Sequence, residues 1–217
     1  MSKVYLFSDI SEPFALQLAK KFSENGDSVW GIASEPLPTD NPDSVSFRNI
    51  HSFSGTPGSS LSVVSFFRKV LNEHDKIDSV LFFGIPVQEN VSVSDSGKLY
   101  FETLVDRKIK NMMFFLSESV KQIRRGKTGA IAFIDYFDPA RKNIANVLWQ
   151  SSFCGIADWM CAVPSVEEIP AVLYRMKNEK KDQAVNFIAE HFKDEQKTYP
   201  AVYVSEDKKS RGFFGLR

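Results

Sequence analysis

The sequence predicts a single α/β domain, residues 1–217, built on a doubly wound, mostly parallel sheet with helices on both faces. Short apolar segments rich in β-forming residues alternate with segments of helical periodicity along the chain. The strand candidates are apolar throughout rather than alternating, which is typical of strands covered on both faces. The first two strand candidates and the helix candidate between them fit into about 30 residues, the spacing of a parallel strand-helix-strand unit.

That unit opens the chain. Lys3–Phe7 is an apolar run that ends in a polar cluster. Apolar residues at helical spacing from Pro13 to Phe22 predict a one-faced helix, with Ser11 as its N-cap. Asn25-Gly26-Asp27 ends this helix, and Ser28–Ala33 is the second strand.

The pattern then repeats towards the middle of the chain. Ser44–Ile50 is interpreted as a third strand and Ser54–Ser60 as a loop. Leu61–Leu71 has the spacing of an amphipathic helix. The apolar run Asp78–Ile85 predicts a central strand, and Val91–Gly97 a polar loop.

A long helix is expected from Tyr100 to Arg125, ending at Gly126, because glycine commonly ends helices and arginines suit their negative end. Gly129–Ile134 predicts the fifth strand and Ala145–Val163 a mostly apolar helix. The remaining expected elements are helices over Val166–Met176 and Asp182–Phe192 and a strand over Ala201–Ser205.

Composition excludes several classes of partner. The 27 Lys and Arg residues balance the 27 Asp and Glu residues, so nothing attracts the chain to nucleic acid or to an anionic membrane. No apolar run predicts a signal peptide or a membrane span. Cys154 and Cys161 lie in one expected helix, where a disulfide is disfavoured, so a reducing cytoplasm is predicted. The three histidines show no metal-ligand spacing, and no metal is expected.

With its elements in this order, the chain resembles the short-chain dehydrogenase/reductase (SDR) family over nearly its full length. The residues from Lys3 to Ser34 resemble the family's opening strand, glycine turn, helix and second strand, and DSVLFFGIP resembles its Asn-Ala-Gly strand. The stretch from Leu104 to Tyr136 resembles the long helix and fifth strand, and VPSVEEIPAVLYRMK and AVYVSED resemble the last helix and strand. The resemblance implies a three-layer, NAD(P)-binding, Rossmann-like fold.

The family's glycine turn, GxxxGxG, falls on Ser8, Glu12 and Phe14. Those glycines let backbone N–H groups at a helix N-terminus approach a pyrophosphate. The ring of Phe14 takes that space, and the carboxylates of Asp9 and Glu12 repel phosphate. A capped helix start with Pro13 in its first turn explains the segment, so no cofactor is expected.

The family's catalytic Tyr-x-x-x-Lys pair falls on Trp149 and Phe153. That chemistry needs a tyrosine made acidic by a neighbouring ammonium, and neither residue supplies these groups. The family's helical Asn falls near Ile109, and Asn111 is about 200° around the helix from that position. The family's catalytic Ser has no counterpart in YFDPARKN, so no catalytic residue is predicted.

Only about ten residues, Trp159–Glu168, separate the helix of Trp149 from the next expected helix. The substrate-loop region is therefore predicted to be shortened, with the sixth strand reduced to Cys161-Ala162-Val163 or absent. An alternative acid/base site could use polar residues at strand ends, although turns also require such residues. These alternative crevice residues are Asp9, Asp135, Tyr136 and Asp138.

We therefore predict a catalytically inactive SDR-like protein that acts as a structural or regulatory subunit of a dehydrogenase complex. Its two middle helices, which carry Met112-Met113 and Leu148-Trp149, have large apolar residues on more than one side. This predicts an oligomer, either a homodimer or tetramer or a pair with a related active dehydrogenase subunit. The tail Phe213–Leu216 could cover the apolar patch instead. A divergent oxidoreductase or a small-ligand binder that uses the crevice is the alternative function.

Overall fold

The computed structural model describes residues 2–33, 37, 48–56, 58–86, 101–102, 104–136, 144–162, 169–176, 180–192 and 201–204. Within these ranges seven strands form one parallel sheet with the order β3-β2-β1-β4-β5-β6-β7. The strands are β1 (Val4–Phe7), β2 (Ser28–Ala33), β3 (Ile50–Ser54), β4 (Ser79–Gly84), β5 (Ala130–Asp135), β6 (Ala171–Arg175) and β7 (Ala201–Val204). The predicted doubly wound α/β class is confirmed.

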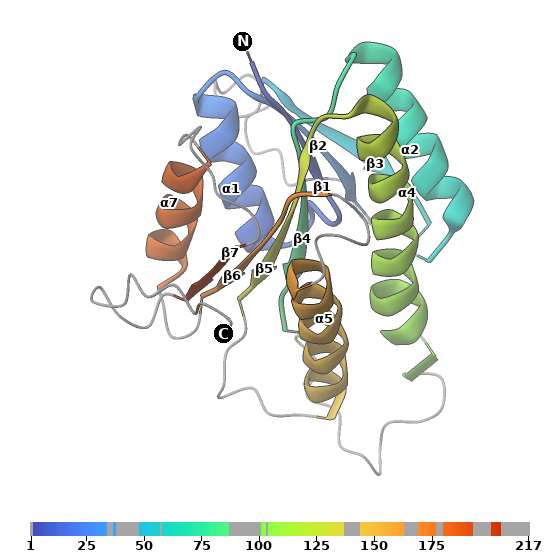
Figure 1. Cartoon of the computed structure of the whole chain (residues 1–217), viewed down its shortest axis with the longest axis vertical. Helices are drawn as coiled ribbons and strands as arrows, with labels where there is room; N and C mark the ends of the chain where they lie inside the picture. Colours follow the sequence, from blue (N-terminus) through green and yellow to red (C-terminus); the bar gives the residue numbers. More distant parts are fainter. Residues whose placement is uncertain are drawn as a thin grey trace.

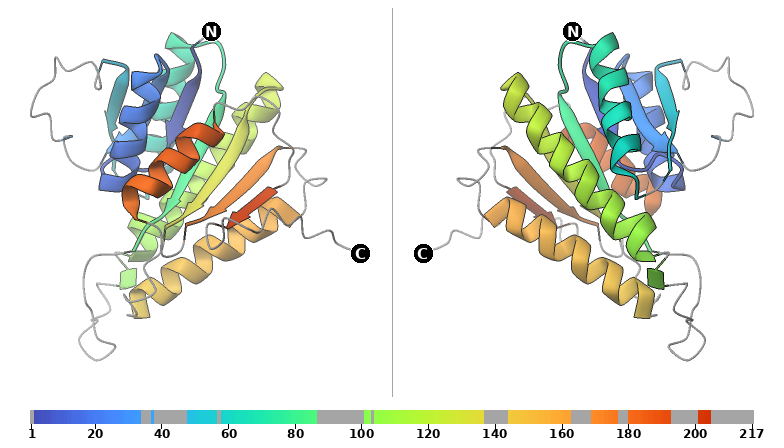
Figure 2. Two further views of the ribbon diagram at one scale, coloured as in Figure 1. Left: turned by 90° about the vertical axis from the view of Figure 1, so that its left-hand side faces the viewer. Right: turned by 90° about the vertical axis from the view of Figure 1, so that its right-hand side faces the viewer.

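Helices cover both faces of the sheet (Figures 1 and 2). On one face lie α1 (Pro13–Glu24) and α7 (Lys181–His191); on the other lie α2 (Ser60–Glu73), α4 (Asn111–Gly126) and α5 (Ile144–Ala162). A π-helical segment, η2 (Val105–Lys110), leads directly into α4. Each predicted helix that coincides with one of these elements is confirmed to within a few residues.

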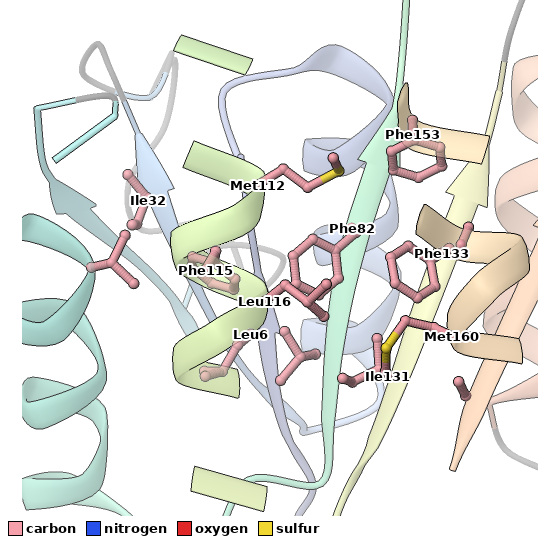
Figure 3. Packing of buried hydrophobic residues seen from close by; sticks show 14 of the residues in the cluster. Leu6, Ile32, Phe82, Met112, Phe115, Leu116, Ile131, Phe133, Phe153 and Met160 are labelled. Carbon is pink, nitrogen blue, oxygen red and sulfur yellow. The ribbon is translucent and has the colours of Figure 1, made fainter. Parts of the chain in front are cut away.

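The sheet separates two apolar cores because neighbouring residues of a strand point to opposite faces. In β1, Leu6 packs under α2, α4 and α5, whereas Phe7 packs under α1 and α7. Figure 3 shows the first core, in which Phe82 of β4 contacts Phe133 of the adjacent strand β5 and Phe115 of α4. Aromatic rings therefore fill much of the space between the layers.

The third strand lies later in the sequence than predicted. Residues 44–47 of the expected strand Ser44–Ile50 lie outside the described residues, and the observed strand is Ile50–Ser54. Its sequence IHSFS is only partly buried, because β3 is the edge strand and pairs with β2 alone. Such a polar segment lacks the apolar signal by which the central strands are recognised.

The prediction of a helix over Val166–Met176 is wrong. Residues Ala171–Arg175 of this segment form β6, which lies between β5 and β7. The sixth strand is therefore present, and Cys161 and Ala162 belong to α5 rather than to a strand. A short apolar run fits either periodicity, and the pairing on both sides decides it. Only residues 176–180 separate β6 from α7, so the segment after β6 is short.

The start of α1 differs from the predicted one. The N-cap of α1 is Glu12 rather than Ser11, and Pro13 occupies the first turn as expected. The helix α4 ends at Gly126 as predicted, and the left-handed residue that follows it is Lys127, with φ of 53°. Among the described residues, no helix has the length and apolarity that crossing a membrane requires. The predicted loop Val91–Gly97 and the tail Phe213–Leu216 lie outside the described residues.

Candidate functional site

The candidate site lies at the carboxyl ends of β1 and β4, where the order of the sheet reverses. Open α/β sheets bind their ligands at this switch point. A small pocket with a volume of about 20 Å³ lies here. Its lining residues are Ser8, Asp9, Glu12, Phe82, Phe83, Arg107, Lys108, Asn111, Met112, Trp149 and Phe153. This volume holds about one water molecule.

The turn after β1 folds over the end of β2. The backbone N–H of Ile10 donates to the carbonyl of Ile32 over 3.0 Å, and the Ile10 side chain is fully buried. That side chain lies on Gly31, so closely that a Cβ at Gly31 would collide with it. Gly31 thus makes room for a side chain of the same protein.

Phe14, at the family's third glycine position, is buried under the crevice. Its ring stacks on Tyr136 with 4.5 Å between centroids and meets Phe83 at 6.5 Å. The three rings join α1 to the ends of β4 and β5. Phe14 thus packs in the core and is not among the residues that line the pocket.

Lys108 of η2 reaches across the crevice to the turn after β1. Its Nζ donates to Glu12 Oε1 over 2.9 Å and lies 3.7 Å from Asp9 Oδ2. The Asp9 carboxylate also accepts a hydrogen bond from the backbone N–H of Ser11 over 3.0 Å. The carboxylate of Glu12, the N-cap of α1, is thus directed at a lysine and makes no capping hydrogen bond.

The charges of this cluster shift the pKa values of its members. Burial raises the pKa of Asp9 above its usual value, and the attraction of Lys108 offsets only part of this. Burial lowers the pKa of Lys108, but the carboxylates of Asp9 and Glu12 outweigh burial and leave the pKa raised. Lys108 is therefore a permanent cation that neutralises part of the acidic turn.

Sequence reasoning missed Lys108. The buried face of the long helix repeats at Met112, Phe115 and Ser119, and Lys108 stands four residues before Met112 on the same face. A charged residue in line with a buried stripe is the signal that could have revealed it.

A dinucleotide does not fit the described residues of this turn. Its pyrophosphate needs open backbone N–H groups at the N-terminus of α1, close to the end of β1. Here Ile10 covers Gly31, Phe14 is fixed in the core, and the Glu12 carboxylate stands at the helix start. A phosphate group would also lie close to the carboxylates of Asp9 and Glu12. Lys108 compensates one of their two negative charges.

The two residues at the family's catalytic positions are part of the core. Trp149 and Phe153 are 3% and 1% exposed, and their rings lie 5.6 Å apart. The indole N–H of Trp149 donates to the carbonyl of Ile85 over 3.0 Å, which ties α5 to the end of β4. Phe153 lies against Gly84, where a Cβ would come within 2.5 Å of its ring. Both residues line the pocket with carbon and contribute no acid or base.

The remaining sequence-predicted residues do not converge. Ile109 packs against the core under α4, whereas Asn111 lines the pocket, contrary to the expectation that it faces away. The π-helical turn of η2 changes the rotation between these positions, which a regular α-helix could not predict. The backbone N–H of Ser8 donates to the carbonyl of Leu81 over 3.0 Å, which links the residue after β1 to β4.

Asp135 lies on the side of the sheet opposite Tyr136 and faces α5. The thiol of Cys154 donates to Asp135 Oδ2 over 3.4 Å, and Asp135 is 1% exposed. Asp138 lies outside the described residues. Asp9, Asp135 and Tyr136 thus have separate partners, and the described residues contain no cluster suited to a metal ion.

Known structures share this fold. A short-chain dehydrogenase from Streptomyces avermitilis is 12% identical with a TM-score of 0.72, over 93% of this chain and 88% of the other. A metagenomic short-chain oxidoreductase (SDR) in complex with NADP is 13% identical with a TM-score of 0.73, over 94% and 96%. An NADH-dependent reductase, A1-R', complexed with NAD, is 10% identical with a TM-score of 0.74, over 94% of each chain.

The chain therefore has the SDR-like Rossmann fold, as the resemblance in its sequence implied. No family model and no curated protein matches the sequence. At these identities the likeness establishes the fold alone, and function has to be argued from the side chains.

Proposed function

We propose that this chain is a catalytically inactive SDR-like protein that serves as a structural or regulatory subunit. It assembles with itself, as a dimer or tetramer, or with a related active dehydrogenase subunit. Its two free cysteines suit a reducing cytoplasm, in which we place it.

The observation that carries the inactive half of the proposal is the packing of the turn after β1 and the start of α1 against the protein's own side chains. Ile10 lies on Gly31, Phe14 stacks on Tyr136, and Lys108 pairs with Glu12. These contacts come from three different elements. They support a turn selected for internal packing rather than for holding a nucleotide.

The assembly half rests on the outer face of α5. From Ile144 to Ala157 the helix carries no charged residue. Val147, Leu148 and Trp159 on its outer side are 50%, 43% and 49% exposed. Gly155 stands between them, and no atom of the described residues lies within 4 Å of a Cβ placed on it, so a partner could approach the helix backbone. An apolar, uncharged helix face is typical of a surface that is covered in an assembly.

The outer face of α4 is less apolar than the sequence suggested. Met112, Phe115 and Leu116 are buried, and Ile109, Phe114 and Val120 pack against the same core. Met113 is the one large apolar residue of Asn111–Gly126 that is exposed, at 45%. The predicted surplus apolar face on this helix is therefore wrong, and the proposed interface is centred on α5.

Thermal unfolding with dinucleotides tests the inactive half. A ligand at 100 times its Kd would add about 2.7 kcal/mol of stability, equal to roughly 5 to 11 °C for a chain of this length. We expect no such shift with millimolar NAD(H) or NADP(H), and no change in NADH fluorescence. A shift that AMP and inorganic phosphate fail to reproduce would overturn the proposal.

A second function, small-ligand binding or divergent redox chemistry in the crevice, is favoured by one observation. Lys108, Asn111, Asp9 and Glu12 place a cation, an amide and two carboxylates around the pocket. The variant Lys108→Met distinguishes the two functions when it is titrated with the same dinucleotides as the wild-type chain. Dinucleotide binding that this variant weakens more than tenfold would support the crevice function.

A further inference from the structure

Two histidines enclose Trp30 at the edge of the sheet. Trp30, in β2, is 2% exposed, and His51 lies directly opposite it on β3. The two rings stack with 4.3 Å between centroids and 22° between planes. His74, the C-cap of α2, lies at the other end of the indole, with its Nε2 3.1 Å from Trp30 Nε1. Ser28 completes the cluster, with its hydroxyl 3.1 Å from Trp30 Nε1 and 3.3 Å from His74 Nε2.

The indole N–H of Trp30 has two acceptors within reach. An indole nitrogen can only donate a hydrogen bond, and Ser28 Oγ and His74 Nε2 each lie 3.1 Å from it. Protonation of His74 Nε2 would place two donors 3.1 Å apart and leave Ser28 Oγ as the acceptor in this cluster.

Charged groups of both signs lie around the indole. From α2, Lys69 Nζ lies 5.6 Å over the indole ring, and Glu73 is the acidic residue that acts on His51. Asp75 and Lys76 follow His74 in the turn after α2, and Lys76 pairs with Asp78 over 2.7 Å. Acidification would therefore bring one or two imidazolium groups beside Lys69, with Glu73 as the nearby counter-charge.

Protonation of His51 should also destabilise the folded state at acid pH. Burial lowers its pKa below the ordinary value, and His74 and Lys69 add to this, whereas Glu73 opposes it. The unfolded chain then binds the proton more readily than the folded one. Stability from His51 is complete above about pH 6.5 and is lost as the pH falls through the lowered pKa.

The strand that these contacts hold is weakly attached. As the edge strand, β3 bonds to β2 alone, and its five residues are half-buried or exposed. Besides the backbone ladder, the His51–Trp30 stack and the contact of Phe53 with Phe66 hold it to the body of the protein. An edge element with few buried side chains opens at a lower free energy than the core.

The geometry points to an acid-sensitive latch, in which protonation of His74 breaks its hydrogen bond with Trp30 and loosens β3 from β2. The latch does not depend on the proposed subunit function, because it lies at the opposite edge of the sheet from β6 and β7. It would make the exposure of this edge of the sheet depend on pH.

Two-dimensional ¹H–¹⁵N NMR of the three indole groups tests the latch directly. Between pH 8 and 5 the Trp30 indole signal, assigned by its loss in Trp30→Phe, should follow the titration of one imidazole. The Trp149 and Trp159 signals should not. Backbone amides of Ile50–Ser54 should exchange at least tenfold faster at pH 5 than at pH 8, after correction for intrinsic rates.

Variants identify the residue responsible. His74→Gln should remove the titration of the Trp30 signal, whereas His51→Gln and His191→Gln should retain it. A Trp30 signal that does not move, or that titrates equally in His74→Gln, would overturn the inference. If His74→Gln does not fold, the ring signals of the wild-type histidines give the same answer. The Trp30 signal must then share its midpoint with His74, and a midpoint shared with another histidine contradicts the latch.

Discussion

At the scale of single residues, Lys108 organises the crevice. Its ammonium group contacts both acidic residues of the turn after β1, with 25% of its side chain exposed. Without it, two carboxylates of like charge would stand together beside the start of α1. The ion cluster thereby stabilises the turn that follows β1, where dinucleotide-binding Rossmann folds carry their glycines.

Lys108→Met should lower the free energy of unfolding by about 1 to 3 kcal/mol at pH 8, less than for a fully buried pair because water screens the cluster. The loss should shrink below about pH 4, because protonated carboxylates no longer attract the lysine. Urea unfolding at both pH values measures it. Lys110→Met is the matched control, since Lys110 pairs with Asp106 with both side chains 53% exposed, and should change stability by less than about 0.5 kcal/mol. Equal effects of the two variants at pH 8 would contradict this role.

The two cysteines should be unreactive in the folded protein. Burial, followed by nearby carboxylates, raises the pKa of Cys154 and of Cys161 to about 12. Against an ordinary thiol the thiolate fraction at pH 8 falls about 1000-fold. Iodoacetamide should therefore modify the native chain about 1000-fold more slowly than the chain in urea. Native rates within tenfold of the unfolded rates would count against the buried positions. The folded thiols also keep protons that the unfolded chain loses, so stability should fall as the pH rises above about 9.

At the scale of secondary-structure elements, the end of α4 is suboptimal. Lys127 adopts the left-handed conformation that glycine adopts without strain. Lys127→Gly should raise the free energy of unfolding by about 0.5 to 1 kcal/mol. The control Arg125→Gly, inside the last turn, should lower it by up to about 1 kcal/mol. Thermal unfolding measures both, and destabilisation by Lys127→Gly would show that the lysine side chain itself stabilises this end.

The helix α5 has two apolar sides for different reasons. One side, with Trp149, Phe153 and Met160, is buried against β4 and β5. The other side carries Leu148 and Trp159, which the described residues leave exposed. A helix with apolar residues on two sides needs a packing partner on each side. The sheet is the partner for one side of α5, and a second surface is required for the other.

At the scale of the whole molecule, this surface predicts self-association or pairing with a related subunit. Light scattering coupled to gel filtration, at tens of micromolar, should show a species of at least twice the 24.6 kDa of one chain. Leu148→Lys should weaken it by at least tenfold in Kd. Phe187→Lys, at an equally exposed position of α7 on the opposite face, should not. A monodisperse 24.6 kDa species would exclude self-association and leave either a distinct partner or coverage of the patch by the tail Phe213–Leu216.

The architecture could be predicted from the sequence alone. Buried strands such as SVLFFG and AIAFID are apolar along their length, and a two-faced burial is the one environment that suits them. The residues Ser8, Glu12 and Phe14 could also be assigned to the turn after β1 and the start of the first helix, because they directly follow the first apolar strand. The residue types of a short segment are sufficient to predict its structure where burial in the sheet alone determines which residues are accepted.

The places of β3 and β6 in the sheet and the contacts between elements could be established only from the folded structure. The strands β3 and β6 depend on pairing partners far apart in the sequence, and neither IHSFS nor AVLYR identifies its partner by its own pattern. The π-helical turn at Val105–Lys110 changed which residues face the crevice, and it brought Lys108 to Glu12 across 96 positions of sequence. Such long-range contacts arise from the packing of elements against one another, which short sequence windows do not record.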